Sequence, residues 1–501
     1  MMGAALLVAG LLGQWCLGIA AAQALLGRRA ADSPGAGRIN AEIAGLGLVL
    51  GIGGTAWCLF LWSLLGGQLG RPISAGLTIV GLAYGLRLVW PIVADRVPAA
   101  NDSLPDAETR NDRSLAKVCQ ILLALMSLTA IGQALLTPQR LWDERATFGM
   151  RAAVLFEDRT VWSPDLLDPD FVIYHPRYPL LLPLAEQHLY ALLGHVDDRW
   201  SKIIFPLLFI GMCLCFAGVL SRSRSPGGAW LWAVILATVP ALMPHDYGFL
   251  CGQADAPMAC FHGLSILYLW DFWNARAEPT DALPPARSAA IAGLLAALAA
   301  FTKDEGLAFL IIDTGVLLGL AFFSLWRQRP QELSNEEPHF PALRRSPWLV
   351  AGIFPGMSLA ILGPWFFYRT HLPLTTEMNY FGRFASLQLS EQVEPILWMF
   401  RHFAERMFLD PWEWGWQWWL MLAAAALAPR RIVRFGSALL LGDIAGGLLG
   451  LMTAGLLAPV TLHEHIGGSS DRFLMQLAPL AILFAAGQLT SPQESGSGIV
   501  E

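Results

Sequence analysis

Apolar segments long enough to cross a membrane recur along almost the whole of this 501-residue chain. A helix needs about 17 to 25 residues to cross roughly 30 Å of hydrocarbon, and on that measure the sequence offers about thirteen candidate spans. Those that begin at Ala289 and Trp416 are short for a complete crossing. The sequence therefore predicts an all-helical, polytopic membrane protein, with spans that begin near Leu6, Ala41, Ile73, Val118, Lys202, Ala229, Ala254, Ala289, Leu307, Trp348, Trp416, Gly436 and Phe473.

The composition excludes several other classes of protein. The chain is 55% hydrophobic and only 14% charged, whereas soluble domains carry about 25% charged residues. The formal net charge of -6 and the lack of a long basic run argue against nucleic acid as a partner. The seven cysteines lie mostly in apolar segments without CxxC spacing, which argues against a disulfide framework and against a zinc cage.

Arginine and lysine residues indicate the orientation of the spans. Arg28 and Arg29 follow the first apolar segment instead of preceding it, so we expect a retained helix with its N-terminus outside. More than half of all basic residues fall in six short loops that should be cytoplasmic, namely 28–40, 95–117, 221–228, 274–288, 326–347 and 428–435. The outer loops are then 137–201, 244–255, 302–306, 368–415 and 459–472.

This alternation requires residues 180–193 not to cross the membrane. The leucines of that segment share it with the polar residues Glu186, Gln187 and His188. We therefore expect an amphipathic helix that lies in the membrane interface. If it crossed instead, every later span would be inverted. Farther along, the tryptophans of residues 410–419 favour an interfacial belt over a sugar-binding platform.

Four polar motifs stand at the ends of predicted spans in a fixed order within residues 118–490. They are Trp142-Asp143-Glu144 with the later His175-Pro176 and Pro179-Leu180, then Gly252 to Pro257 (GQADAP), Thr302 to Gly306 (TKDEG) and Ser470 to Phe473 (SDRF). Together they resemble the motifs of membrane glycosyltransferases with the GT-C fold. The resemblance is closest to the protein O-mannosyltransferases (dolichyl-phosphate-mannose-protein mannosyltransferases) and the bacterial aminoarabinose transferases. The three spans before Val118 have no counterpart in that pattern. The family's basic residue before its double proline is also missing, and we expect Arg177 to replace it.

The resemblance implies the inverting transfer of a sugar from a polyprenyl phosphate to a lipid, glycan or protein acceptor. Such a transfer needs a carboxylate that orients or deprotonates the acceptor hydroxyl, and cations that hold the phosphate as its charge grows. Asp143 is the first candidate for this carboxylate and Glu144 the second. The structural alternative for Asp143 is a salt bridge to Arg145 or Arg151.

Lys303, Arg472 and Arg177 are the candidates for binding the donor phosphate. Lys303 lies between two apolar segments, where a lone cation is costly unless an anion meets it. Its structural partners would be Asp304 or Glu305, and its functional partner the lipid phosphate. The guanidinium of Arg472 suits a phosphate bidentately, with a salt bridge to Asp471 as the alternative.

The remaining candidates are weaker. Asp255 is expected to be a metal ligand, an acceptor contact or a helix cap. Glu305 and His175 are candidate acceptor or loop contacts. His463 and His465 are weak zinc candidates, because two histidines at i and i+2 lack a placed third ligand. No cofactor is assigned, and a divalent metal ion is left open.

These observations predict a GT-C-like bundle in a bacterial inner membrane, with the site on the outer face. Residues 1–117 would form a three-helix extension, residues 118–490 the glycosyltransferase domain, and residues 491–501 a disordered tail. The alternatives are a transporter and an inactive scaffold with the same fold. Transporters usually show paired repeats and broken helices at the midplane, and the sequence shows no internal repeat.

Overall fold

The computed structural model describes residues 2–27, 40–94, 107–244, 246–275, 283–328, 342–374, 380–458 and 461–489. The residues so described form helices joined by short connections, with no strand among them. The predicted all-helical class is therefore confirmed. The expected tail at 491–501 and much of the basic loops at 28–40, 95–117 and 326–347 lie outside the described residues.

Eight described helices are long and apolar enough to cross a membrane, and a ninth crossing is formed if the bent pair α20 and α21 counts as one span. These helices are compatible with a multi-pass membrane protein. Each of the thirteen expected positions carries a helix, but the count of thirteen spans is not confirmed. Two of those helices, α10 (Pro226–Ala237) and α18 (Gln417–Leu427), are apolar but have only 12 and 11 residues.

The N-terminal half consists of four long helices, a group of short elements and a fifth long helix. The long ones are α1 (Met2–Leu26), α3 (Ala41–Leu64), α4 (Arg71–Ala94), α5 (Ala107–Leu136) and α9 (Ile204–Leu220). The short ones, between α5 and α9, are the π-helix η1 (Asp143–Gly149), α6 (Met150–Asp158), α7 (Pro164–Leu167), η2 (Pro169–Tyr174), α8 (Leu181–Leu193) and η3 (Ser201–Ile203).

The C-terminal half continues from α10 with η4 (Pro240–Leu242) and four long helices. These are α11 (Asp255–Ala275), α12 (Pro285–Thr302), α13 (Asp304–Gln328) and α14 (Ala342–Arg369). Then follow α15 (Tyr380–Ala385), η7 (Leu389–Gln392), α16 (Val393–Leu409), α17 (Pro411–Trp414), α18, η8 (Pro429–Arg431), α19 (Phe435–Leu457), α20 (Leu462–Met475) and α21 (Ala478–Leu489).

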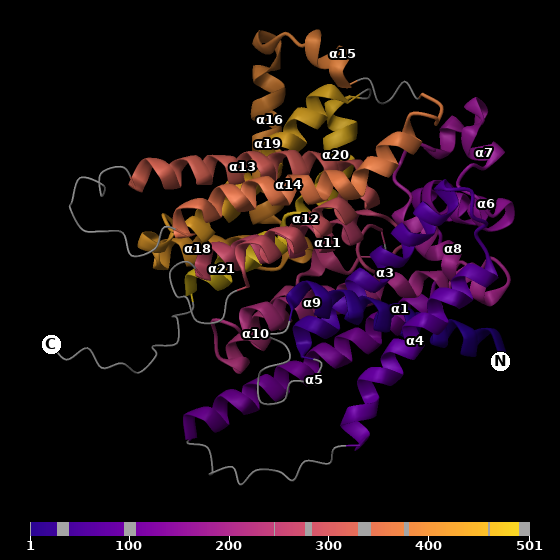
Figure 1. Cartoon of the computed structure of the whole chain (residues 1–501). Coiled ribbons are helices and arrows are strands. Elements are labelled where there is room, and N and C mark those ends of the chain that lie inside the picture. The colour runs from indigo at the N-terminus through magenta and orange to yellow at the C-terminus, as the bar shows by residue number, and fades with distance from the viewer. Residues whose placement is uncertain are drawn as a thin grey trace.

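Most long helices run roughly side by side, so the bundle has two ends (Figure 1). Helices α6, α7 and α8 lie at one end, at the right of Figure 1, and we call it the α7 end. The C-terminal end of α13 lies at the opposite side of the bundle, together with α18. Helix α9 joins the two ends: its 17 residues span about 25 Å between Lys202 and Arg222.

The three N-terminal helices pack directly against the rest of the bundle. Helix α3 contacts both α1 and α9. A side chain on Gly45 would collide with the backbone of Gly211 and Cys215 in α9, at 2.5 Å from each. Small residues allow helix backbones to approach this closely in membranes. The predicted extension at residues 1–117 therefore shares a core with the helices that follow it.

Helix α8 corrects one prediction. Every residue from Leu181 to Leu192 is buried, including the polar Glu186, Gln187 and His188. The helix contacts α1, α3, α4 and α6, so its polar face meets protein and not water. Its 13 residues span only about 20 Å, too little for a complete crossing. The prediction that the polar face of this helix is exposed at the membrane interface is therefore wrong, because neighbouring helices cover both faces.

Candidate active site

Asp255 is the centre of a charged cluster at the α7 end. It is the first residue of α11, and its side chain is only 1% exposed. Its Oδ1 accepts a hydrogen bond from Lys303 Nζ at 2.7 Å, and its Oδ2 accepts from Arg472 Nη2 at 2.9 Å. Gln476 Nε2 contacts Oδ1 at 3.4 Å. One buried carboxylate thus joins the GQADAP, TKDEG and SDRF motifs.

Arg472 extends the cluster to the segment between α5 and α6. Its Nη1 lies 3.1 Å from Asp143 Oδ2. Asp143 begins η1, a seven-residue π-helix, and π-helical turns are rare and often found at functional sites. The expected salt bridges from Asp143 to Arg145 or Arg151 are therefore not the ion pair observed; Arg472 is the partner. Asp471, the expected structural partner of Arg472, pairs with Arg406 instead.

Lys303 stands at a break between two helices. Helix α12 ends at Thr302, Lys303 has extended backbone angles, and α13 begins at Asp304. Its ammonium lies 2.7 Å from both Asp255 Oδ1 and Glu305 Oε1. Burial lowers the pKa of Lys303, but the carboxylates of Asp255 and Glu305 outweigh this effect, and the pKa is raised. Lys303 is therefore a fixed cation.

Gly306 explains why the TKDEG motif needs its glycine. A Cβ at this position would lie 2.4 Å from the carbonyl oxygen of Ala299 in α12. The start of α13 can therefore pack against the end of α12 only without a side chain here. This close packing holds Lys303 and Glu305 beside Asp255.

We call Asp143, Asp255, Lys303, Glu305 and Arg472 the Asp255 cluster. Its members differ in how deeply their side chains are buried. The side chains of Asp255 and Lys303 are 1% and 8% exposed, whereas those of Arg472, Glu305 and Asp143 are 25%, 28% and 36% exposed. Three carboxylates face two cations, so the formal charge is -1. The cluster is closed on the side of Asp255 and open on the side of Asp143.

Glu144 has a different environment from its neighbour Asp143. Its side chain is 2% exposed and accepts hydrogen bonds from the backbone N–H groups of Arg140, Leu141 and Gly252, at 2.6 to 2.9 Å. Lys202 Nζ lies 3.6 Å away. These contacts tie η1 to the segment before α11. Asp143, whose side chain is 36% exposed, is therefore the more accessible acid of the pair.

Arg177 and His175 lie beside the cluster without joining it. Arg177 Nη1 donates to the carbonyl oxygen of Leu372, at 3.3 Å. Burial lowers the pKa of Arg177, as does Arg369, while Asp304 opposes the shift. His175 has a positive φ of 52° and stacks on Tyr178 at 4.9 Å. The structure thus groups Arg177 with the Arg369–Asp304 pair at the end of α14.

The two candidate zinc ligands of α20 point to different neighbours. The ring of His463 meets Trp398 at 4.2 Å, while His465 interacts electrostatically with Glu305, Lys303 and Arg472. Among the described residues, no group of three or more His, Cys, Asp or Glu side chains is arranged to hold a metal ion.

Sequence reasoning missed Gln476 and three ionisable residues inside apolar helices, His262, Asp313 and Asp443. The sequence did contain a signal for these three ionisable residues, because a charge in the middle of an apolar segment is costly and usually functional. Comparisons with models of protein families, with curated proteins and with solved structures find no match to this chain.

Proposed function

We propose that this protein is an inverting membrane glycosyltransferase that moves a sugar from a polyprenyl phosphate to a lipid, glycan or protein acceptor. One observation carries the proposal: motifs from four distant parts of the chain meet in the Asp255 cluster, which opens on one side. Two cations and an accessible carboxylate in one place are the groups that such a transfer needs.

The ion pairs of the Asp255 cluster suggest how a donor would bind. The phosphate would bind Arg472 and Lys303 and would replace Asp143 at Arg472 Nη1, which lies at the exposed side. Because the cluster already has a formal charge of -1, an additional anion must displace one of its carboxylates. Asp143 is the most exposed of the three. Donor binding would therefore release Asp143 for the acceptor.

The chemical step would then proceed in line. The acceptor oxygen attacks the anomeric carbon while its proton passes to Asp143. The bond between the anomeric carbon and the phosphate oxygen breaks, and the phosphate leaves with the electron pair. Lys303 and Arg472 stabilise the added negative charge. Asp255 would act as a positioning residue that holds both cations, and Glu144 would hold η1 in place.

The proposal includes a GT-C-like bundle of about thirteen spans, in which α4 and α11 also cross the membrane, while α10 and α18, with 12 and 11 residues, would need the segments that flank them to reach across. It places the protein in a bacterial inner membrane with the α7 end outside. The basic residues of the loops support this orientation. Cysteines at Thr160 and Ser386 in a cysteine-free background should react with an impermeant thiol reagent in intact cells. A cysteine at Ser334, outside the described residues, should not; its labelling would overturn the orientation.

A transporter is the second candidate function. The observation in its favour is the presence of His262, Asp313 and Asp443 inside apolar helices, since buried ionisable groups often mark ion paths. A transporter would move a substrate without changing it, whereas a transferase would leave free polyprenyl phosphate as a product.

The test is chemical and begins in cells. Lipid-linked sugars and surface glycans of a deletion strain are compared with those of its parent and of a strain that carries the gene with Asp143→Asn. A transferase predicts that one glycan loses a sugar and that its lipid-linked donor accumulates, in both the deletion and the variant strain. Unchanged glycans and unchanged donor lipids in the deletion strain would contradict the proposal.

A further inference from the structure

Three ionisable side chains meet in the interior of the bundle, away from the Asp255 cluster. His262 lies in α11, Asp313 in α13 and Asp443 in α19, and their exposed fractions are 1%, 0% and 0%. Helices α13 and α19 are among the eight candidate membrane spans. Asp313 is nine residues from the start of α13, and Asp443 is fourteen residues from the end of α19. All three groups therefore lie well inside apolar helices.

Glycines of α19 bring the carboxylates together. Gly442, Gly446 and Gly450 recur every fourth residue and face α13, where a Cβ on any of them would contact Ile312 or Val316. Small residues at this spacing allow two membrane helices to pack closely. Asp443 follows the first of these glycines and Asp313 follows Ile312. The two carboxylates interact electrostatically across this contact.

Hydrogen bonds satisfy only some of the polar atoms of His262, Asp313 and Asp443. His262 Nε2 lies 3.3 Å from Asp313 Oδ1, and the imidazole stacks on Phe309 at 4.2 Å. Among the described residues, no hydrogen-bond partner is found for His262 Nδ1, Asp313 Oδ2 or either carboxylate oxygen of Asp443. An ionised carboxylate that is buried without a partner costs several kcal/mol or more. Asp443 therefore needs a cation or a proton.

Within the part of the chain that the structure describes, the neighbouring helices supply no cation at this depth. Helices α9 and α21 contain no charged residue, and those of α12 and α14 lie at their ends. Helices α15, α16 and α20 meet α19 near its last residues, where Arg383 donates to Leu457 and where Met399 and Ile466 contact Gly455. Their charged groups thus lie about 20 Å from Asp443 along α19. On α11 the nearest charged residues, Asp255 and Asp271, are each about two turns or more from His262.

We propose that His262, Asp313 and Asp443 form a proton-binding site within the membrane core. With imidazole neutral and both acids ionised, the cluster would carry a charge of -2, so two protons make it neutral. One is shared by His262 and Asp313 across their hydrogen bond. The other resides on Asp443, which has no basic partner among the described residues. This inference does not depend on glycosyl transfer.

Dicyclohexylcarbodiimide tests the proposal, because this apolar reagent modifies protonated carboxyl groups in apolar surroundings. The wild-type protein in native membranes is treated at neutral pH and the modified residues are located by mass spectrometry. We expect modification of Asp443. Asp255 is the internal control: it is equally buried, but Lys303 and Arg472 keep it ionised and unreactive.

Two further measurements complete the experiment. Labelling of Asp443 should fall as the pH rises, and Asp443→Asn should lose the label on α19. Absence of label from both Asp313 and Asp443 in the wild-type protein would overturn the proposal. So would strong protection by sodium relative to choline, because the site would then bind a metal cation and not a proton. Neither result depends on a transferase assay, so the proposed function is tested separately.

Discussion

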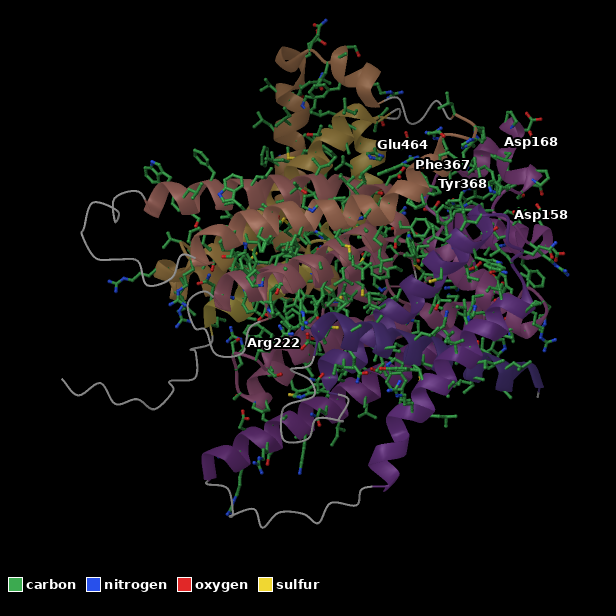
Figure 2. The ribbon with its side chains drawn as sticks, viewed as in Figure 1. Asp158, Asp168, Arg222, Phe367, Tyr368 and Glu464 are labelled. Carbon is green, nitrogen blue, oxygen red and sulfur yellow. The ribbon has the colours of Figure 1, made fainter. Side chains whose placement is uncertain are left out.

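Two charged clusters occupy the two ends of helix α11, one centred on a carboxylate and the other on a guanidinium. At one end, Asp255 is a single carboxylate that holds two cations. At the other end, Arg222 is a single cation held by two carboxylates, those of Glu42 and Asp271. Asp255 and Asp271 are sixteen residues apart, about 24 Å along the helix. In Figure 2, Arg222 correspondingly lies far from Asp158 and Asp168 at the α7 end.

The two clusters differ in how far their side chains are exposed. The side chains of Arg222, Glu42 and Asp271 are 14%, 7% and 8% exposed, and the hydroxyl of Tyr268 donates a further hydrogen bond to Glu42 at 2.8 Å. Each guanidinium arm of Arg222 already has a carboxylate. In the Asp255 cluster, by contrast, the outer contact between Arg472 and Asp143 is partly open to the surroundings, with side chains 25% and 36% exposed. The Arg222 group therefore stabilises the bundle, and the Asp255 cluster is the better candidate for binding and chemistry.

The largest effect is expected from Asp143→Asn. General-base assistance typically contributes about 10²- to 10⁴-fold, so turnover should fall by that factor while the folded yield and donor binding are retained. The measurement is transfer from a polyprenyl-phosphate sugar by purified protein. Asp170→Asn, at an exposed acid of the same segment between α5 and α9, is the matched control and should leave turnover unchanged. Activity above about a tenth of wild type would exclude Asp143 as the base.

The next largest effect is expected on the free energy of unfolding, when the carboxylates at the two ends of α11 are replaced in turn. Asp255→Asn removes the buried anion that two cations share and leaves each with only a more exposed carboxylate, Glu305 or Asp143, so it should cost about 3 to 5 kcal/mol. Asp271→Asn should cost less, about 1 to 3 kcal/mol, because Arg222 keeps Glu42. Unfolding of both variants in the same detergent measures the difference. A greater loss of unfolding free energy in Asp271→Asn than in Asp255→Asn would contradict this ranking of the two clusters.

The sequence predicted the helices better than the contacts between them. A long apolar segment is a local signal, and each expected position carries a helix. The environment of α8 was not readable, because Glu186 is buried against Gln139, a residue 47 positions earlier. Burial of a polar face by other helices depends on packing that no local pattern contains.

The same reason limits the prediction of the site. The candidate residues were named from their motifs, but most partners expected from chain proximity were wrong. Asp304 pairs with Arg369 and Asp471 with Arg406, whereas Lys303 and Arg472 share Asp255. Only the pair of Lys303 with Glu305 followed from proximity in the chain. The shared partner lies 48 and 217 residues away, and only the packed bundle brings it there.

A smaller effect is expected from Lys303→Met, which keeps the apolar stem and removes the ammonium. Hydrogen bonds to charged groups contribute about 1.5 to 3 kcal/mol, so affinity for polyprenyl phosphate should fall roughly 10- to 150-fold. Lys202→Met is the control, because Lys202 is a buried lysine of the same end that pairs with Glu144. It should reduce thermal stability and leave donor affinity near normal in the folded fraction. Unchanged affinity in Lys303→Met would remove Lys303 from phosphate binding.

The smallest effect is expected from replacing arginine by lysine in each cluster, because the charge is kept and only the planar fork is lost. Arg472→Lys can still meet Asp255 and a phosphate, though not bidentately, so donor affinity and turnover should fall about fivefold, which corresponds to about 1 kcal/mol. Arg222→Lys cannot span Glu42 and Asp271 with two separate arms, so it should lower the unfolding temperature and leave donor affinity unchanged. Both proteins are measured for donor binding and for unfolding. If Arg472→Lys lost only stability, as Arg222→Lys should, the open cluster would be a second structural pairing and the functional distinction between the two ends of α11 would fail.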